Sequence, residues 1–242
     1  MGNKLAKESQ YDIQFETINK KGPVELGPTP SHLWRNDPRH LCFLLSRYKF
    51  VSKLLSDKKN VLEIGCGDAF GTRLVLQTVR RVHGVDFDPL FIKWAIDQYQ
   101  EEGFNASFEV VDLTKRSPTG GPYDAVYALD FIEHIKKEKE NAVIDNICRV
   151  LNQDAICILG APNVAASRYA GRDSGLGHIN LKGAEEMKSL LSGYFQNVMI
   201  FSMNDEVVHT GFYPMAHYLF GIGTGLKKGG KQHMSGKEIL KN

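Results

Sequence analysis

The chain has 242 residues, of which 42% are apolar and 24% are charged, and its formal net charge is +2. These values are ordinary for a globular protein, and the length suits one large α/β domain. The small net charge argues against a nucleic acid or an anionic membrane as partner. The first residues are polar and the apolar runs are short, so we expect a cytoplasmic protein with no signal peptide and no membrane segment.

The cysteines form no C-x-x-C pair, and each lies within an apolar run. We therefore expect buried, reduced thiols instead of a disulfide framework or a zinc site. The residues concerned are Cys42, Cys66, Cys148 and Cys157.

Residues 1–36 are polar at first and then rich in glycine and proline. Prolines at this density oppose helix and strand alike, so we expect an extended arm with at most a short helix around 11–18. Trp34 stands near its end, where the arm is a candidate lid over a site. The main domain is expected over 37–226, and the polar, glycine- and lysine-rich segment 227–242 predicts a disordered tail.

A long helix is expected directly after the arm. Asp37-Pro38 is a typical helix start, and apolar residues then recur at helical spacing over 38–56. His40 and Arg47 lie off the apolar face of this helix, and we expect both at the solvated surface.

From Asn60 onward strand and helix patterns alternate, which predicts βαβ units and a parallel sheet. The last two strands are expected to pair antiparallel at a sheet edge. The prediction is therefore a Rossmann-like α/β fold with a mostly parallel seven-stranded sheet, an antiparallel edge strand and helices on both faces. The expected strands are 60–64, 81–86, 107–111, 123–129, 155–159, 195–202 and 217–221; the expected helices cover 70–79, begin at 89 and near 136, and cover 181–191.

The first strand of this sheet runs into a glycine turn, Glu63-x-Gly65-x-Gly67, which lets a ligand approach the backbone closely. A dinucleotide fingerprint would place a third glycine three residues after Gly67, but Gly71 comes one residue later. Asp86 follows about 20 residues on, at the end of the second strand. This combination suits a cofactor that has a ribose but no pyrophosphate.

Acidic residues close three consecutive strands, namely Asp86, Asp112 and Asp130. In an open α/β sheet, ligands bind at the carboxyl ends of the strands. Aspartate is common in turns, but three such placements together favour a polar ligand.

The glycine turn with Asp86 resembles motif I and its successor in class I S-adenosylmethionine (SAM) methyltransferases. The segment Asp124–Ile135 is similar to the fourth-strand motif of the small-molecule branch of that family, which includes ubiquinone-type O-methyltransferases. The resemblance implies SAM as cofactor and S-adenosylhomocysteine as product. It also implies that Asp86 takes the ribose hydroxyls and that Asp112 approaches the adenine, with Leu113 beside it. The implied cofactor contacts are Glu63, Gly65, Cys66, Gly67, Asp86, Phe87, Asp112, Leu113 and Asp130.

A hydroxyl acceptor must lose its proton during methyl transfer, and histidine suits that task at neutral pH. His134 stands where relatives place a catalytic histidine, although it is also placed to cap the helix that follows. His178 is the second candidate. Contacts with the acceptor are expected from the following long loop and from the arm. These residues are Arg168, Tyr169, Arg172, Asn180 and Trp34.

A metal site is the less favoured alternative here. Asp130, Glu133 and His134 could join His178 around a divalent cation, and some sugar methyltransferases use magnesium. Three ligands within five residues of a strand-to-helix turn rarely converge, however. The sequence prediction is therefore no metal.

We expect methyl transfer to a hydroxyl of a small polar metabolite, a sugar or nucleotide-linked sugar, by a monomer or homodimer. The arginines and tyrosine of the long loop favour such an acceptor, and the segment Ser46–Val51 is similar to helices of bacterial methyltransferases encoded near surface-glycan genes. N-methylation of an amino sugar or another amine stays open. Two functions of other classes remain open, a nicotinamide-dependent oxidoreductase and a non-catalytic SAM-binding protein. The position of Gly71, one residue later than in a dinucleotide fingerprint, counts against the oxidoreductase.

Overall fold

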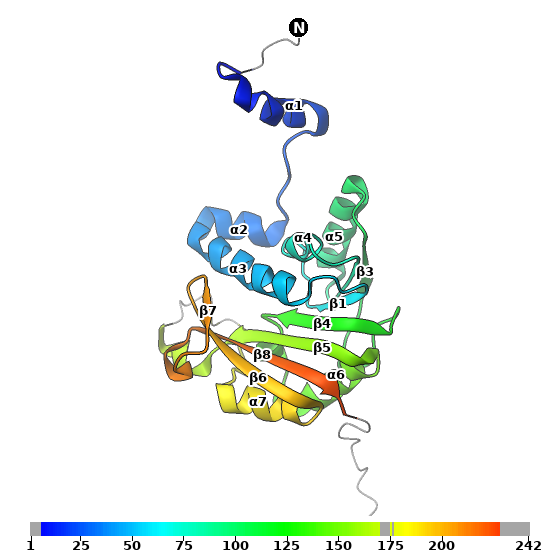
Figure 1. The fold of residues 1–242 in the computed structure, drawn as a ribbon, viewed down its shortest axis with the longest axis vertical. Coiled ribbons are helices and arrows are strands. Elements are labelled where there is room, and N and C mark those ends of the chain that lie inside the picture. The colour runs from blue at the N-terminus through cyan, green and yellow to red at the C-terminus, as the bar shows by residue number, and fades with distance from the viewer. Residues whose placement is uncertain (1–5, 170–174, 176, 228–242) are drawn as a thin grey trace, which may run out of the picture.

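The computed structural model describes residues 6–169, 175 and 177–227. Its centre is an eight-stranded sheet with the order β3-β2-β1-β4-β5-β8-β6-β7, and helices cover both faces (Figure 1). The predicted Rossmann-like architecture is confirmed. The strand count differs by one, because the short strand β7 forms a hairpin with β6 beyond the predicted edge.

The five strands of the first half are parallel, with β1 at the centre between β2 and β4. Strand β8 then runs antiparallel between β5 and β6. The predicted antiparallel pairing of the last two long strands is therefore confirmed, but β8 lies inside the sheet. The strands are β1 Val61–Ile64, β2 Val82–Asp86, β3 Ala106–Val110, β4 Tyr123–Leu129, β5 Leu151–Pro162, β6 Phe195–Asn204, β7 Val207–His209 and β8 Tyr218–Leu226.

Helices fill the connections between the strands, and short 3-10 turns surround the carboxyl ends of β4 and β5. The α-helices are α1 Asp12–Lys21, α2 Pro28–Asn36, α3 Pro38–Leu54, α4 Thr72–Val75, α5 Pro89–Glu102, α6 Glu140–Cys148 and α7 Ala184–Ser192. The 3-10 helices are η1 Ser9–Tyr11, η2 Ile132–His134, η3 Lys137–Lys139, η4 Val164–Tyr169 and η5 Tyr213–Met215. None of the helices described is long and apolar enough to cross a bilayer.

Two apolar layers hold the sheet between its helices. On one face, Val51 of α3 and Val75 of α4 pack against alternate residues of the strands. On the other face, Ile144 of α6 and Met187 of α7 pack against the intervening residues. The alternation follows from the two-residue period of a strand, so each central strand must be apolar on both sides.

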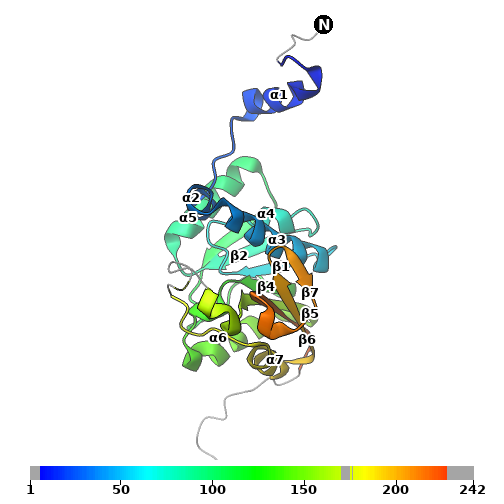
Figure 2. The same ribbon diagram turned by 90° about the vertical axis from the view of Figure 1, so that its left-hand side faces the viewer.

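The arm is more helical than the sequence predicted. The expected short helix is α1, which has no buried residue and projects away from the domain in both views (Figures 1 and 2). Helix α2 was not expected. Its prolines, Pro28 and Pro30, stand in the first turn, where a helix needs no backbone N–H donor, so they do not oppose it.

Three smaller predictions were also wrong. The helix expected over 70–79 shortens to α4, and irregular turns continue to β2. The fifth strand, expected over 155–159, is longer in the structure, where β5 already begins at Leu151. Cys42 is exposed, although all four cysteines are free thiols as expected. The tail predicted over 227–242 lies outside the described residues except for Lys227.

Candidate active site

The turn after β1 leaves its outer side open. Gly65 and Gly67 have φ angles of +67° and +53°, in the left-handed region that favours glycine. A Cβ on Gly65 would lie 3.1 Å from the ring of Phe131, so the turn contacts the segment that follows β4. A Cβ on Gly67 would meet nothing within 4 Å. The turn therefore has space beside it in which a ligand can approach the backbone.

Asp86 ties the end of β2 to this turn. One carboxylate oxygen accepts a hydrogen bond from the Gly67 N–H at 3.1 Å, and the other accepts from the Asp88 N–H at 2.9 Å. Asp86 is half-buried, and its neighbour Phe87 is 74% exposed. Because each carboxylate oxygen has a second lone pair, both oxygens can still accept from a ligand hydroxyl.

Glu63 lies beneath the glycine turn, where a ligand at the surface cannot touch it. It is 1% exposed, and it accepts hydrogen bonds from Thr72 Oγ1 at 2.5 Å and from the Tyr48 hydroxyl at 3.1 Å. Burial raises the pKa of Glu63 to about 7 despite these bonds. Cys66 is also buried, and burial raises the pKa of its thiol. Both side chains support the turn from within.

At the end of β3, Asp112 folds back on its own turn. It accepts from the Thr114 N–H at 3.0 Å and hydroxyl at 2.7 Å, and it forms an ion pair with Lys115 at 2.8 Å. The Lys115 and Thr114 bonds lower the pKa of Asp112 to about 2. The side chain keeps 38% exposure, whereas Leu113 is buried.

Asp130 closes β4 with a φ of +52°, an uncommon angle for a residue other than glycine. Its carboxylate forms an ion pair with the Arg47 guanidinium at 2.7 Å. That guanidinium also lies 4.0 Å from the centre of the Tyr218 ring. Arg47, expected at the solvated surface, instead points into the site, with a side chain only 12% exposed. His40 is half-buried.

Next to Asp130, the structure brings Glu133, His134 and His178 together. The two imidazole rings lie 5.1 Å apart, and one ligand-capable atom from each of the three residues lies within 4.8 Å of the others. Glu133 is fully buried, and neither of its carboxylate oxygens has a hydrogen-bond partner among the described residues. Burial, followed by the charge of Asp130, raises the pKa of Glu133 to about 8. Burial and then the charge of His134 lower the pKa of His178.

The hydrogen bond of His134 determines which ring nitrogen is free. Nδ1 lies 3.0 Å from the Gly177 carbonyl oxygen, and a carbonyl can only accept, so Nδ1 carries the proton. Nε2 then keeps its lone pair. The side chain is exposed, so this lone pair is available for a proton or a metal ion.

Asn180 does not have the role that the sequence predicted. Its side chain is 9% exposed, and its amide donates to the Ile135 carbonyl and to Glu140. Lys182 forms a buried ion pair with the same glutamate and donates to the Asn180 amide oxygen at 3.1 Å. Asn180 is therefore part of a buried polar network and cannot contact an acceptor.

The other predicted acceptor contacts lie at the surface. Arg168 stacks over Tyr169 with 4.7 Å between the guanidinium carbon and the ring centre, and Tyr169 is 70% exposed. Trp34 on α2 is 64% exposed. Arg172 lies outside the described residues.

The glycine turn also holds the arm, through an acid that the sequence reasoning passed over. Asp68 is buried, and its carboxylate accepts from the Thr29 N–H at 2.7 Å in the first turn of α2. A carboxylate at a helix N-terminus satisfies a free donor and favours the helix dipole. The bond spans 39 residues of sequence, which is why no local pattern revealed it.

A cavity of about 690 Å³ lies between the arm and α5. Its lining includes Val24, Leu26, Trp94 and Phe104, and it reaches the glycine turn only at Ala69 and Phe70. No site residue predicted from the sequence lines it. The arm is fixed along it by a hydrogen bond from Gln98 to the Glu25 carbonyl at 2.9 Å.

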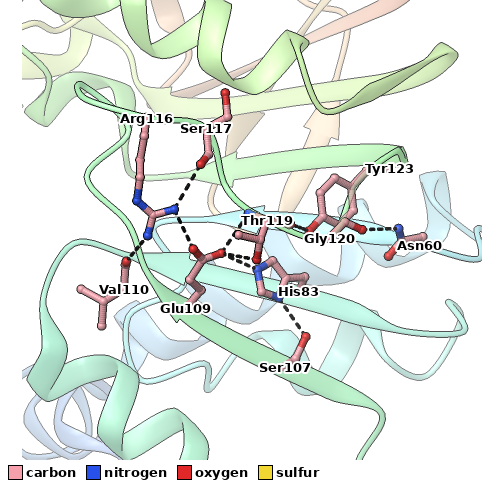
Figure 3. Close-up of polar contacts among 10 residues, drawn as sticks. All are labelled: Asn60, His83, Ser107, Glu109, Val110, Arg116, Ser117, Thr119, Gly120 and Tyr123. Carbon is pink, nitrogen blue, oxygen red and sulfur yellow. Dashed lines mark hydrogen bonds and ion pairs between the residues drawn. The ribbon is translucent and has the colours of Figure 1, made fainter.

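A second pairing of glutamate and histidine lies on β2 and β3 (Figure 3). His83 contacts Glu109 at 3.2 Å, and Arg116 and Thr119 donate to the same carboxylate at 2.7 and 2.8 Å. Partial burial opposes ionisation, but the bonds from Thr119, Arg116 and His83 outweigh it and lower the pKa of Glu109 to about 2. Both oxygens of this carboxylate accept hydrogen bonds, so the cluster links β2 and β3 to the 112–122 loop.

Comparison with known proteins agrees with this arrangement. Residues 61–154 match the family model of a methyltransferase domain. The chain is 26% identical over 150 residues to a probable S-adenosylmethionine-dependent methyltransferase of Mycolicibacterium smegmatis, covering 60% of this chain and 56% of that protein. It is 31% identical over 90 residues to phosphoethanolamine N-methyltransferase 1 of Triticum aestivum, covering 36% of this chain and 18% of that protein. The chain thus spans about half the length, or less, of these curated relatives.

Among solved structures, the fold is similar to that of the N-methyltransferase NodS from Bradyrhizobium japonicum in complex with S-adenosyl-L-homocysteine. The TM-score is 0.57 at 17% identity, over 87% of this chain and 97% of that one. At this identity the likeness concerns the fold. Taken with the family model matched over 61–154 and with the relatives, it supports a class I SAM-dependent methyltransferase domain with SAM as its cofactor.

Proposed function

We propose that the protein transfers the methyl group of SAM to a hydroxyl of a small polar metabolite, a sugar or nucleotide-linked sugar. The observation that carries the proposal is the pair of imidazoles, His134 and His178, beside the end of β4, which contacts the glycine turn through Phe131. In this assignment Asp86 accepts hydrogen bonds from the ribose hydroxyls, and Asp112 approaches the adenine amino group.

The step is an in-line displacement at the methyl carbon. The acceptor oxygen forms a bond to that carbon as the carbon–sulfur bond breaks, and the electron pair of that bond neutralises the sulfonium. The hydroxyl proton passes to Nε2 of His134, the nitrogen that its hydrogen bond to Gly177 leaves free. Alignment of the reactants can contribute about 7–11 kcal/mol, and a positioned base about 10²–10⁴-fold in rate.

The acceptor is assigned as a small molecule, with neither nucleic acid nor a membrane as partner, and the protein as a monomer or homodimer. Two exposed side chains support a polar acceptor. Arg168 and Tyr169 lie on η4, directly after β5, where a guanidinium can pair with a carboxylate or phosphate of the acceptor.

N-methylation of an amine is the second candidate. It is favoured by the names of two compared proteins, the wheat phosphoethanolamine N-methyltransferase and NodS, each described as an N-methyltransferase. An amine that is already neutral needs no base before attack, so this reaction would depend less on His134.

The test has two parts. Calorimetric titration with SAM, S-adenosylhomocysteine and NADH should give micromolar binding of the first two and none of the third. Panels of sugar and amino-sugar acceptors are then incubated with SAM, and methylated products are identified by mass spectrometry. Products carrying an O-methyl group support the proposal, products carrying only N-methyl groups support the second candidate, and binding of NADH alone would refute both.

A further inference from the structure

Glu133 is a buried carboxylate that has no hydrogen-bond partner among the described residues. It stands in η2, directly after β4, and is 0% exposed with both oxygens unbonded among the described residues. Its backbone carbonyl accepts from the N–H groups of Ile179 and Asn180, each at 3.0 Å, so the loop carrying His178 is fixed to it. Burying an unpaired acidic group is unfavourable, and native proteins rarely leave one unmatched. A ligand that meets this carboxylate would account for its position.

Two imidazoles converge on the same point. One ligand-capable atom from each of Glu133, His134 and His178 lies within 4.8 Å of the other two. Two atoms that each lie about 2.1 Å from one ion are at most about 4.2 Å apart. His134 is exposed and His178 is half-buried, so neither ring is fully enclosed by the protein as Glu133 is.

His134 already makes the hydrogen bond that a metal-binding histidine commonly makes with its non-ligating nitrogen. His134 donates from Nδ1 to the Gly177 carbonyl at 3.0 Å, which leaves Nε2 with its lone pair. Ligating histidines commonly make such a bond with their other ring nitrogen. Gly177 has a φ of +82°, and a Cβ there would lie 3.2 Å from Nδ1, so glycine permits this close approach.

The positively charged side chains of Arg47 and Lys182 form ion pairs with carboxylates other than Glu133. Arg47 pairs with Asp130 at 2.7 Å, and Lys182 pairs with Glu140. Asp130 is thereby occupied, so it does not belong to the convergent group that the sequence had considered. Neither cation donates a hydrogen bond to Glu133 in the described structure.

We propose that Glu133, His134 and His178 form a binding site for a divalent cation of the first transition series. Two imidazoles and one carboxylate suit Mn²⁺, Fe²⁺, Co²⁺ or Zn²⁺ better than Mg²⁺ or Ca²⁺, which prefer oxygen ligands. Three protein ligands leave coordination positions for oxygen atoms of another molecule.

This site deepens the proposed function and rests on it, because the cation would bind the acceptor hydroxyl. Coordination lowers the pKa of a bound hydroxyl, as it does for bound water. The proton then leaves to solvent, the oxygen attacks the methyl carbon, and the carbon–sulfur bond breaks as before. With the cation bound, Nε2 of His134 is a ligand and no longer the base proposed above. The acceptor class narrows to molecules whose reactive hydroxyl can reach the cation.

The test is calorimetric titration of the chelator-treated full chain with MnCl₂ and ZnCl₂, with MgCl₂ for comparison and no SAM or acceptor present. We expect one Mn²⁺ or Zn²⁺ per chain. Glu133→Gln and His178→Gln should each weaken binding by about 10-fold or more. The matched control is Glu109→Gln, which neutralises the glutamate of the other glutamate–histidine pair and should leave metal affinity unchanged.

Circular dichroism and a thermal melt establish that each variant is folded at the titration temperature. Absence of Mn²⁺ and Zn²⁺ binding by the wild type would overturn the inference, as would wild-type affinity in both Glu133→Gln and His178→Gln. SAM titration of the same samples separates the two proposals. SAM binding without metal binding refutes only the cation site, whereas absence of SAM binding refutes the proposed function whatever the metal does.

Discussion

The chain contains two pairings of glutamate with histidine, and they differ in what completes them. Around Glu109, His83, Arg116 and Thr119 occupy the carboxylate, and the pKa is lowered to about 2 (Figure 3). Around Glu133 no group among the described residues completes the carboxylate, and the pKa is raised to about 8. Residue types alone therefore do not distinguish the two clusters. The difference lies in whether the protein itself satisfies the acid.

The largest expected effect is on turnover, and it should distinguish His134 from His83. His134→Ala should lower turnover at saturating SAM by about 10²–10⁴-fold while SAM affinity stays unchanged, because the base or ligand at the acceptor is lost. His83→Ala is the matched control and should lower the melting temperature without lowering turnover per folded molecule. Full activity of His134→Ala would show that His134 has only a structural role, through its bond to the Gly177 carbonyl.

The next effect concerns the cofactor end of the site. Asp86→Ala removes the acceptor that holds the Gly67 and Asp88 N–H groups and that is assigned to the ribose. SAM affinity measured by calorimetry should fall by about 10-fold or more, as expected when hydrogen bonds to a charged group are lost. If the affinity does not change, Asp86 does not belong to the cofactor site.

Glu109→Gln should lower the free energy of unfolding at pH 7 by about 1–3 kcal/mol, because charge-assisted hydrogen bonds are lost. The pH dependence follows from its lowered pKa. An acid with a usual pKa of 4.5 and a folded pKa of about 2 stabilises the fold above pH 4.5 and loses this contribution as pH falls through 2. Urea denaturation between pH 5 and pH 2 should therefore show a smaller acid loss in the variant; parallel curves would contradict the assignment.

Glu133 should give the opposite sign of pH dependence. Its folded pKa of about 8 lies above the usual 4.5, so the native state holds a proton that the unfolded state has released. Stability in the presence of a chelator should therefore decline as pH rises from 4.5 through 8, by about 1.4 kcal/mol for each unit of pKa difference at most. Glu133→Gln should remove this decline. A wild-type curve that is flat over this range would show that Glu133 is ionised when folded.

The sequence predicted the parts that local patterns encode. Apolar runs gave the parallel strands, and the glycines with Asp86 identified the turn and the family. Contacts between distant segments were missed. Arg47 is 83 residues from Asp130, so helical periodicity placed it at the surface although the ion pair buries it. The sequence suggested Asn180 as a contact of the acceptor. Its hydrogen bonds with Glu140 and Lys182 could not be foreseen, because they depend on how a loop packs against α6. Likewise, the prolines of α2 argue against a helix until the hydrogen bond from Thr29 to Asp68, which stabilises the first turn, is known.

The bond between Asp68 and Thr29 makes the arm and the cofactor turn energetically coupled. The carboxylate that stabilises the first turn of α2 belongs to the same loop that we propose approaches SAM. Coupling between two binding events is reciprocal, so a cofactor that orders the loop also favours the docked arm, and a docked arm favours the cofactor by an equal free energy. If SAM binds at this loop, residues upstream of the domain become part of what sets its affinity for SAM, although none of them need touch the cofactor.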